Sequence, residues 1–387
     1  MYSAQKYCIF EPNKFTNRLM QPYNWQQKDW AKFKYSLKGL ETVLSQIAYN
    51  EGKYEGIVST LPENLQADTI IDLMVIEAIK TSEIEGEYLS RKDVLSSIKK
   101  NLGVHQKKDS VSNKNAEHIS KMMVDVRNTF AKPLSKTMLC QWHATLFEDD
   151  TSIETGKWRT HKEPMQIVSG AMGKQKVHFE APPSDRVANE MKLFIQWYND
   201  TAPGGKTPIG NSAVRASIAH LYFESIHPFE DGNGRIGRAL AEKALSQGAG
   251  KPVLLSLSFT IEKNKKQYYT QLQNASKSNE ITKWLCYFIQ VISDAQKSAG
   301  KQIEYTLKKI KFLDTWKPQL NERQMKVINK MLDAGIEGFE GGMNAGKYVS
   351  ITKSSKATAT RDLQELFSIG VFVSSGGGRS TCYTLKL

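Results

Sequence analysis

The chain has 387 residues, of which 40% are hydrophobic, and it carries a formal net charge of +13 at pH 7. This length predicts two or three domains, because single hydrophobic cores stop growing at about 250 to 300 residues. The composition excludes a low-complexity chain and allows a sizeable core. The positive charge indicates attraction to nucleotides, nucleic acid or acidic proteins, without choosing among them.

Cysteine usage and the N-terminal residues bear on the compartment. The four cysteines lie far apart and form no CxxC pair, which argues against a zinc module and against a disulfide framework; they are Cys8, Cys140, Cys286 and Cys382. A secretory signal is not expected, since Glu11 arrives before any apolar stretch. No run approaches the roughly 18 apolar residues of a membrane span. We therefore expect a cytoplasmic protein with reduced thiols and no membrane partner.

Apolar residues at helical spacing dominate the chain and predict a mainly α fold. An N-terminal helical segment is expected over 1–65, with Trp25 and Trp30 as core or interdomain anchors. A helix over 66–81 runs on to Gly86, and the next begins at Ser90, whose hydroxyl is expected to form a capping pair with Asp93. Further helices are predicted at 116–131, 135–148, 184–200, 209–226, 233–247, 263–276 and 280–313.

Two β-prone runs interrupt the helical pattern before residue 183 and flank a tip that contains Gly170 and Gly173. They predict a β-hairpin. An isolated hairpin is marginal by itself, so it needs a reason to exist. It is either a structural flap over the core or an edge that pairs with a peptide substrate, and the pattern does not choose between them.

The last residues, 319–387, read as a separate module that follows a helical linker over 301–318. Three helical stretches and two short β-prone runs predict a winged-helix domain. Arg361 would lie on its recognition helix, but Asp362 and Glu365 on the same helix oppose DNA binding. Docking to protein or dimerisation is therefore favoured over DNA contact.

The stretch from His227 to Arg238, with the sequence HPFEDGNGRIGR, holds the groups of a phosphate-handling site. His227 can accept a proton from a hydroxyl nucleophile at neutral pH. Asp231 or Glu230 could hold Mg²⁺, which prefers carboxylate and phosphate oxygens. The other six histidines, His220 among them, are interpreted as hydrogen-bonded core residues.

The second half of the stretch supplies donors for an anion. Gly232, Asn233 and Gly234 present backbone N–H groups at the start of a predicted helix. Arg235 and Arg238 lie three residues apart on one helical face, so each can take a phosphate. Together with the histidine base, these groups predict transfer from a nucleoside triphosphate, driven by positioning and charge neutralisation.

At every specified position the stretch resembles the Fic-domain signature HxFx(D/E)GNGRxxR, and the resemblance covers roughly residues 66–300. It implies an all-helical Fic core with a β-hairpin flap, flanked by modules as in multidomain bacterial Fic proteins. It further implies adenylyl transfer, in which AMP passes from ATP to a Tyr, Thr or Ser hydroxyl of a target protein, the enzyme itself included. Pyrophosphate is released.

The resemblance also implies a role for each residue of the motif. His227 would be the base, Phe229 a buried anchor, and Asp231 the ligand of Mg²⁺. Residues 232–234 would form the anion hole, while Arg235 contacts the β-phosphate and Arg238 the γ-phosphate. Relatives that phosphorylate carry a lysine near the position of Gly234, so glycine there favours nucleotidyl transfer.

Two further segments gain a meaning from the resemblance. Thr81-Ser-Glu-Ile-Glu85-Gly86 fits the inhibitory motif (S/T)xxxE(G/N), in which Glu85 would pair with Arg238 and occupy the arginine that the γ-phosphate requires. The alternative is a solvated carboxylate at a helix end. The flap residues Val177, His178 and Phe179 would pair with the target as an added strand.

Other functions stay open. The same fold can remove AMP from a modified target, with Glu85 orienting water. A second class is a transcriptional regulator, in which the C-terminal module binds DNA and the core senses nucleotide. A homodimer is plausible because members of the family often associate.

Overall fold

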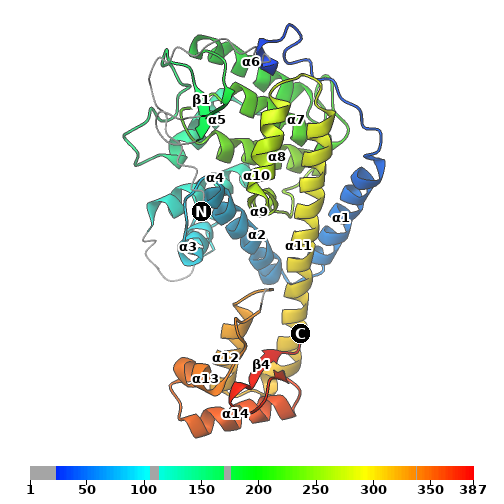
Figure 1. Ribbon diagram of the computed structural model, residues 1–387. Coiled ribbons are helices and arrows are strands. Elements are labelled where there is room, and N and C mark those ends of the chain that lie inside the picture. Colours follow the sequence, from blue (N-terminus) through cyan, green and yellow to red (C-terminus); the bar gives the residue numbers. More distant parts are fainter. Residues whose placement is uncertain (1–22, 105–112, 170–175, 337) are drawn as a thin grey trace. The chain divides into compact units, whose positions relative to one another are not determined.

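The computed structural model describes residues 23–104, 113–169, 176–336 and 338–387, and over these the chain is mainly helical (Figure 1). Two antiparallel two-stranded sheets are the only sheets in these ranges. The predicted mainly α fold with a hairpin is confirmed. The chain divides into two compact units, one that reaches Ala299 and one that begins at Gly300.

Among its described residues, the first unit contains ten α-helices, the start of an eleventh and one two-stranded hairpin. The order of these elements is α1 (Glu41–Ser59), α2 (Glu63–Ile84), α3 (Arg91–Asn101), α4 (Lys114–Asn128), α5 (Lys136–Leu146), β1 (Gln166–Ser169), β2 (Lys176–Glu180), α6 (Ser184–Asp200), α7 (Ser212–Ile226), α8 (Asn233–Ala249), α9 (Leu257–Lys263), α10 (Lys265–Ala275) and α11 (Thr282–Trp316).

Three local expectations differ from the structure. The helix expected over 263–276 corresponds to α10, but the short helix α9 before it was not expected; Asn264 separates the two with φ −137° and ψ 47°. Ser90 stands at the N-cap of α3 in an extended conformation, but its hydroxyl accepts no capping hydrogen bond. Segment 23–40 is largely irregular, so the helical N-terminal segment begins only at α1.

Helices α7 and α8 lie side by side at the centre of the first unit (Figure 1). Nearly every residue of α7 is buried, polar ones such as Arg215 and His220 included, so the helix is surrounded by other elements on all sides. The buried Lys243 of α8 is satisfied by neutral acceptors, since it donates to the carbonyls of Thr129 and Phe130 at 2.6 and 2.9 Å. The predicted phosphate-handling stretch comprises the loop between α7 and α8 and the beginning of α8.

The irregular N-terminal segment anchors the hairpin to this core. Trp25 is buried and donates through Nε1 to the Glu180 carbonyl at 2.7 Å. Tyr23 packs edge-on against Phe179 at 5.2 Å between ring centroids. Asn24 donates to Ser225 Oγ at 2.9 Å, next to the end of α7. Trp25 therefore acts as a core anchor, in line with the prediction.

The second unit has its own apolar core. After the end of α11 it contains α12 (Glu322–Leu332), α13 (Ala345–Thr352), α14 (Lys356–Ser368), β3 (Phe372–Ser375) and β4 (Cys382–Leu385). Asp362 turns into this core, where it accepts from Tyr348 at 2.7 Å and pairs with Arg323 at 3.0 Å. The assignment of this unit as a winged-helix domain stays a prediction.

Two compositional expectations can be compared with the described residues. Cys140, Cys286 and Cys382 form no disulfide, and Cys8 lies outside the described ranges. Within these ranges, every helix is too short or too polar to cross a membrane.

Candidate active site

His227 caps the C-terminus of α7 in a left-handed conformation, with φ 51° and ψ 62°. This conformation costs a residue with a Cβ roughly 1 to 2 kcal/mol, so the surrounding structure must hold it. The following Pro228 disfavours continuation of the helix. The His227 side chain is nearly buried, and its Nδ1 lies 3.8 Å from Glu224 Oε2, one helical turn earlier.

The loop after His227 is fixed by reciprocal hydrogen bonds. Asn233 accepts from the Phe229 N–H through Oδ1 at 3.0 Å and donates through Nδ2 to the Phe229 carbonyl at 2.8 Å. The Phe229 ring is fully buried and stacks on His143 at 4.1 Å, with Trp158 at 4.9 Å. Phe229 therefore anchors the loop.

His143 is a part of the site that the sequence reasoning missed. Burial lowers its pKa to about 4, although nearby Asp231 opposes the shift. The imidazole is therefore neutral at pH 7, and its Nδ1 accepts from the Gly156 N–H at 2.9 Å. No sequence signal distinguishes this histidine, because the residues that contact it, Gly156 and Phe229, are distant from it in sequence.

Glycines at the start of α8 open space for an anion. Gly232, the N-cap, has φ 77°, and a Cβ there would lie 2.7 Å from Phe147 Cε2. A Cβ on Gly234 would lie 2.3 Å from Glu85 Oε1 and 3.0 Å from Arg238 Nη1. The first N–H groups of a helix have no partner within it, so this end of α8 suits a phosphate. Glu85 occupies the space beside Gly234.

Arg238 is fully buried and held by the end of α2. It donates through Nε to Thr81 Oγ1 at 2.8 Å, and through Nη2 to the Thr81 carbonyl at 3.0 Å and to Glu85 Oε1 at 3.1 Å. Burial alone would lower the pKa of this guanidinium, but the negative charge of Glu85 and its neighbours raises it overall. The predicted contact between Glu85 and Arg238 is thus present.

Arg235 meets a second carboxylate of the same segment. Its Nη1 lies 3.1 Å from Glu87 Oε2, and its Nη2 lies 3.7 Å from Asp231 Oδ2. Gly86 makes this possible, because its φ of 90° turns the chain at the end of α2 and the Glu87 N–H returns to the Ser82 carbonyl at 2.9 Å. The sequence reasoning missed Glu87. Its position two residues after Glu85 could have indicated a second carboxylate near the arginines of the motif.

Both arginines have side-chain donors that form no hydrogen bond with the described residues. Arg238 Nη1 and Arg235 Nε are buried and have no hydrogen-bond partner among the described residues. A buried donor left unsatisfied is costly, and unmatched donors on two neighbouring arginines fit an anionic ligand. The donor set therefore suits the phosphates of a nucleotide.

Asp231 is the loop carboxylate that could hold a magnesium ion. Asp231 is partly exposed and accepts from the Gly232 N–H through Oδ1 at 2.6 Å. The described ranges contain no group of three or more His, Cys, Asp or Glu side chains that could hold a metal. A single carboxylate fits Mg²⁺, which binds through one or two carboxylates together with nucleotide phosphates.

The hairpin residues are placed unequally. In β2, Val177 pairs with Val168 and Phe179 with Ile167, and the register shifts between these pairs. The Phe179 side chain is buried, while those of Val177 and His178 are partly exposed. The His178 carbonyl accepts from Gln273 Nε2 at 3.4 Å, and that of Glu180 from Trp25. The tip, 170–175, lies outside the described residues.

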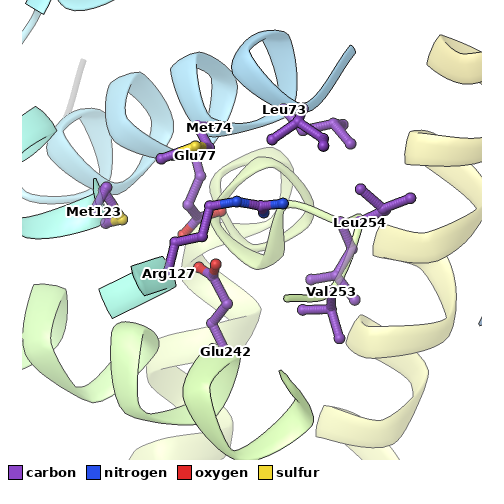
Figure 2. A pocket seen from close by; sticks show the side chains of 10 residues that line it. Leu73, Met74, Glu77, Met123, Arg127, Glu242, Val253 and Leu254 are labelled. Atoms are coloured by element: carbon purple, nitrogen blue, oxygen red, sulfur yellow. The ribbon is translucent and has the colours of Figure 1, made fainter. Parts of the chain in front are cut away.

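A charged pocket lies elsewhere between α2 and α8. Figure 2 shows Glu77, Arg127 and Glu242 pointing into it from three helices. Burial, with repulsion by Glu77, raises the pKa of Glu242 to about 8, and Arg127 partly offsets this rise. The Glu77 carboxylate accepts from Ser256 Oγ at 2.6 Å and from the Ser258 N–H at 2.9 Å. None of the predicted site residues lines this pocket.

Comparison with known families identifies the region around the motif. Residues 133–245 match the Fic/DOC family, and residues 23–104 match a domain of unknown function, DUF4172. The chain therefore contains a Fic/DOC region. Its Fic region holds the loop from His227 to Arg238, whereas Thr81, Glu85 and Glu87 lie in the region of the DUF4172 match.

Similar proteins agree with this family. The chain is 28% identical over 138 residues to protein adenylyltransferase fic-1 of Caenorhabditis briggsae, which is 36% of this chain and 23% of that protein. It is 28% identical over 128 residues to a probable protein adenylyltransferase of Aquifex aeolicus, 33% of this chain and 32% of that one. The chain thus spans about a quarter to a third of these Fic relatives.

A solved structure supports the fold alone. The crystal structure of a Fic-domain-containing signaling protein from Bacteroides thetaiotaomicron superposes with a TM-score of 0.51 and 19% sequence identity. The match covers 67% of this chain and 97% of that one. The all-helical core of a Fic protein is therefore present.

Proposed function

We propose that this chain is a protein adenylyltransferase that is inhibited in the conformation described. One observation carries the proposal. Two buried arginines with unmatched donors converge at a glycine-lined helix N-terminus, one short loop away from a nearly buried histidine. The proposed substrates are ATP and a target protein with a Tyr, Thr or Ser hydroxyl, the enzyme itself included.

In the proposed reaction His227 takes the proton of the target hydroxyl, and the oxygen attacks the α-phosphorus of ATP. A new P–O bond forms as the bond to the β-phosphate oxygen breaks, and pyrophosphate leaves. The N–H groups of 232–234 and the arginines at 235 and 238 stabilise the phosphate charge. Asp231 would hold Mg²⁺, which would neutralise part of the same charge.

The inhibition is proposed to come from two carboxylates that compete with the phosphates. Glu85 contacts Arg238 and fills the space beside Gly234, while Glu87 contacts Arg235. A triphosphate needs the same donors, so both carboxylates must move before it can bind productively. Thr81 and Gly86 support this arrangement, Thr81 by accepting from Arg238 and Gly86 by its turn.

The experiment is AMP transfer by the full-length chain. Wild type, Glu85→Gly and Glu85→Gly/His227→Ala are incubated with Mg²⁺ and with ATP labelled at either the α- or the γ-phosphate. We expect strong protein labelling from α-labelled ATP by Glu85→Gly, weak labelling by wild type and none by the double variant. Label from γ-labelled ATP would instead indicate phosphoryl transfer and refute the proposal. Equal labelling by wild type and Glu85→Gly would refute the inhibitory role of Glu85.

Removal of AMP is the alternative within the same site, and the position of Glu85 next to the N-terminus of α8 favours testing it. A target labelled by the Glu85→Gly variant is incubated with wild type and with that variant, without ATP. Release of AMP by wild type alone would assign hydrolysis to Glu85.

A second candidate is nucleic-acid contact through the C-terminal unit. Asp362, an acid that opposed this reading, is turned inward by Tyr348 and Arg323, whereas Arg361 stays exposed on α14. Salt-dependent retention of duplex DNA by the full chain, lost in Arg361→Ala, would support it. A dimer remains a prediction, tested by the mass in solution.

A further inference from the structure

The segment Gly156-Lys-Trp-Arg159 packs against the loop that begins at His227, although the chemistry proposed above gives this segment no role. The Gly156 N–H donates to His143, and Trp158 packs on Phe229. The Arg159 N–H donates to the Pro228 carbonyl at 2.9 Å. Backbone and side chains of this segment thus contact the residues immediately after His227.

The Arg159 side chain goes further and reaches His227 itself. Its Nε donates to the His227 carbonyl at 2.8 Å, and its Nη2 approaches the Ile226 carbonyl at 3.4 Å. The other end of the guanidinium holds the exit of the hairpin, with Nη2 donating to the Pro182 carbonyl at 2.5 Å and Nη1 to Ser184 Oγ at 3.0 Å. One side chain therefore joins two segments that flank the loop.

Arg159 is a buried cation whose hydrogen bonds all go to neutral oxygens. Arg159 is 2% exposed and forms no ion pair among the described residues. Burial lowers the pKa of its guanidinium to about 10, because only neutral oxygens surround it. Carbonyls at the end of a helix lack partners within the helix, and the planar fork of arginine can bind several at once.

The contact with the His227 carbonyl bears on the geometry of the reaction. The direction of a carbonyl is set by ψ of its own residue, and His227 has the left-handed values φ 51° and ψ 62°. These values direct the imidazole, and a residue with a Cβ keeps them only when its surroundings impose them. A donor that binds the carbonyl oxygen therefore restrains the backbone from which the imidazole projects.

We propose that Arg159 is a positioning residue that holds His227 in the left-handed conformation from which its imidazole acts. The role rests on the proposed function, in which His227 is the base. Lysine in place of Arg159 keeps a charge but has one nitrogen, which cannot reach the hairpin exit and the end of α7 together.

Arg215 provides a matched control. It is also buried, and it donates to the Tyr198 carbonyl at 2.7 Å and to Gln247 Oε1 at 2.9 Å, with none of its hydrogen bonds going to the motif loop. Arg215→Lys should lower stability in the same way as Arg159→Lys. It should leave the His227 carbonyl untouched.

The test uses full-length protein in the Glu85→Gly background, with α-labelled ATP. We expect Arg159→Lys to lower kcat at least tenfold with KM for ATP within about twofold, and Arg215→Lys to leave both within about twofold. Ser184→Ala, which removes one outer anchor, should lower kcat a few fold and serves as the test if Arg159→Lys does not fold. A folded Arg159→Lys enzyme, or a Ser184→Ala enzyme in its place, with parental kcat would overturn the proposal.

A second readout is independent of activity. The Cε1 resonance of His227 in protein with ¹³C-labelled histidine, assigned by its loss in His227→Ala, should move in Arg159→Lys and stay in place in Arg215→Lys. If the Glu85→Gly parent transfers no AMP, the proposed function fails while this comparison still decides whether Arg159 positions His227. An unmoved resonance in Arg159→Lys would count against the role.

Discussion

Glu87→Gln tests whether the end of α2 blocks both arginines of the motif. Glutamine keeps the size of the side chain and removes the charge that attracts Arg235. Glu85→Gln does the same for Arg238. The matched control is Glu83→Gln in the same segment, because Glu83 binds Lys80 at 2.5 Å and touches neither arginine.

The expected magnitudes follow from the burial of the two pairs. The Glu85 and Arg238 side chains are 6% and 0% exposed, so their contact is worth about 1.5 to 3 kcal/mol, or roughly 10- to 150-fold in the population open to ATP. Glu87 is 34% exposed, and water screens its pair with Arg235 to about 0.5 to 1 kcal/mol, or roughly two- to fivefold. Glu83→Gln should change nothing at the site.

The assay is ATP affinity by calorimetry together with AMP transfer, on each single variant and on Glu85→Gln/Glu87→Gln. Affinity should rise in the order Glu83→Gln, Glu87→Gln, Glu85→Gln, double variant. Weaker ATP binding by Glu87→Gln than by wild type would refute the reasoning, since Glu87 would then orient Arg235 for ATP rather than compete with it.

Two further predictions concern stability. Gly232→Ala combines left-handed strain with a Cβ placed 2.7 Å from Phe147, whereas Gly250 has a similar φ of 71° and open space around it. In urea unfolding, the free energy of unfolding should fall by about 2 kcal/mol or more in Gly232→Ala and by about 1 kcal/mol in Gly250→Ala. Equal losses in the two variants would exclude the clash with Phe147. Because the pKa of Glu242 rises from 4.5 to about 8 on folding, the folded chain binds a proton that the unfolded chain releases, so this group's stability contribution is complete below pH 4.5 and is lost as the pH rises to about 8. Between pH 5 and pH 9 the free energy of unfolding should therefore fall by a few kcal/mol less in Glu242→Gln than in wild type. The measurement is the melting temperature of both proteins across this pH range, and an equal dependence on pH would contradict the prediction.

Local sequence patterns were sufficient for the helical class and for the hairpin, because apolar spacing and turn residues act over a few positions. They were less successful where the chain leaves regular structure. The seven-residue helix α9 was not predicted, and Ser90 takes the N-cap position without the capping bond that its hydroxyl could make. A helix this short shows too few apolar positions for a clear period, and a capping residue type does not by itself ensure the capping bond.

By itself the sequence determined that a histidine, an aspartate, three glycines and two arginines share one stretch from His227 to Arg238, since these groups are close in sequence and their chemistry does not depend on the remaining fold. Only the tertiary structure decided what surrounds them. Glu87 is 148 residues from Arg235, and Arg159 is 68 from His227. Such contacts arise when segments distant in the sequence pack together, and the pattern of apolar and polar residues along the chain does not say which segments will meet.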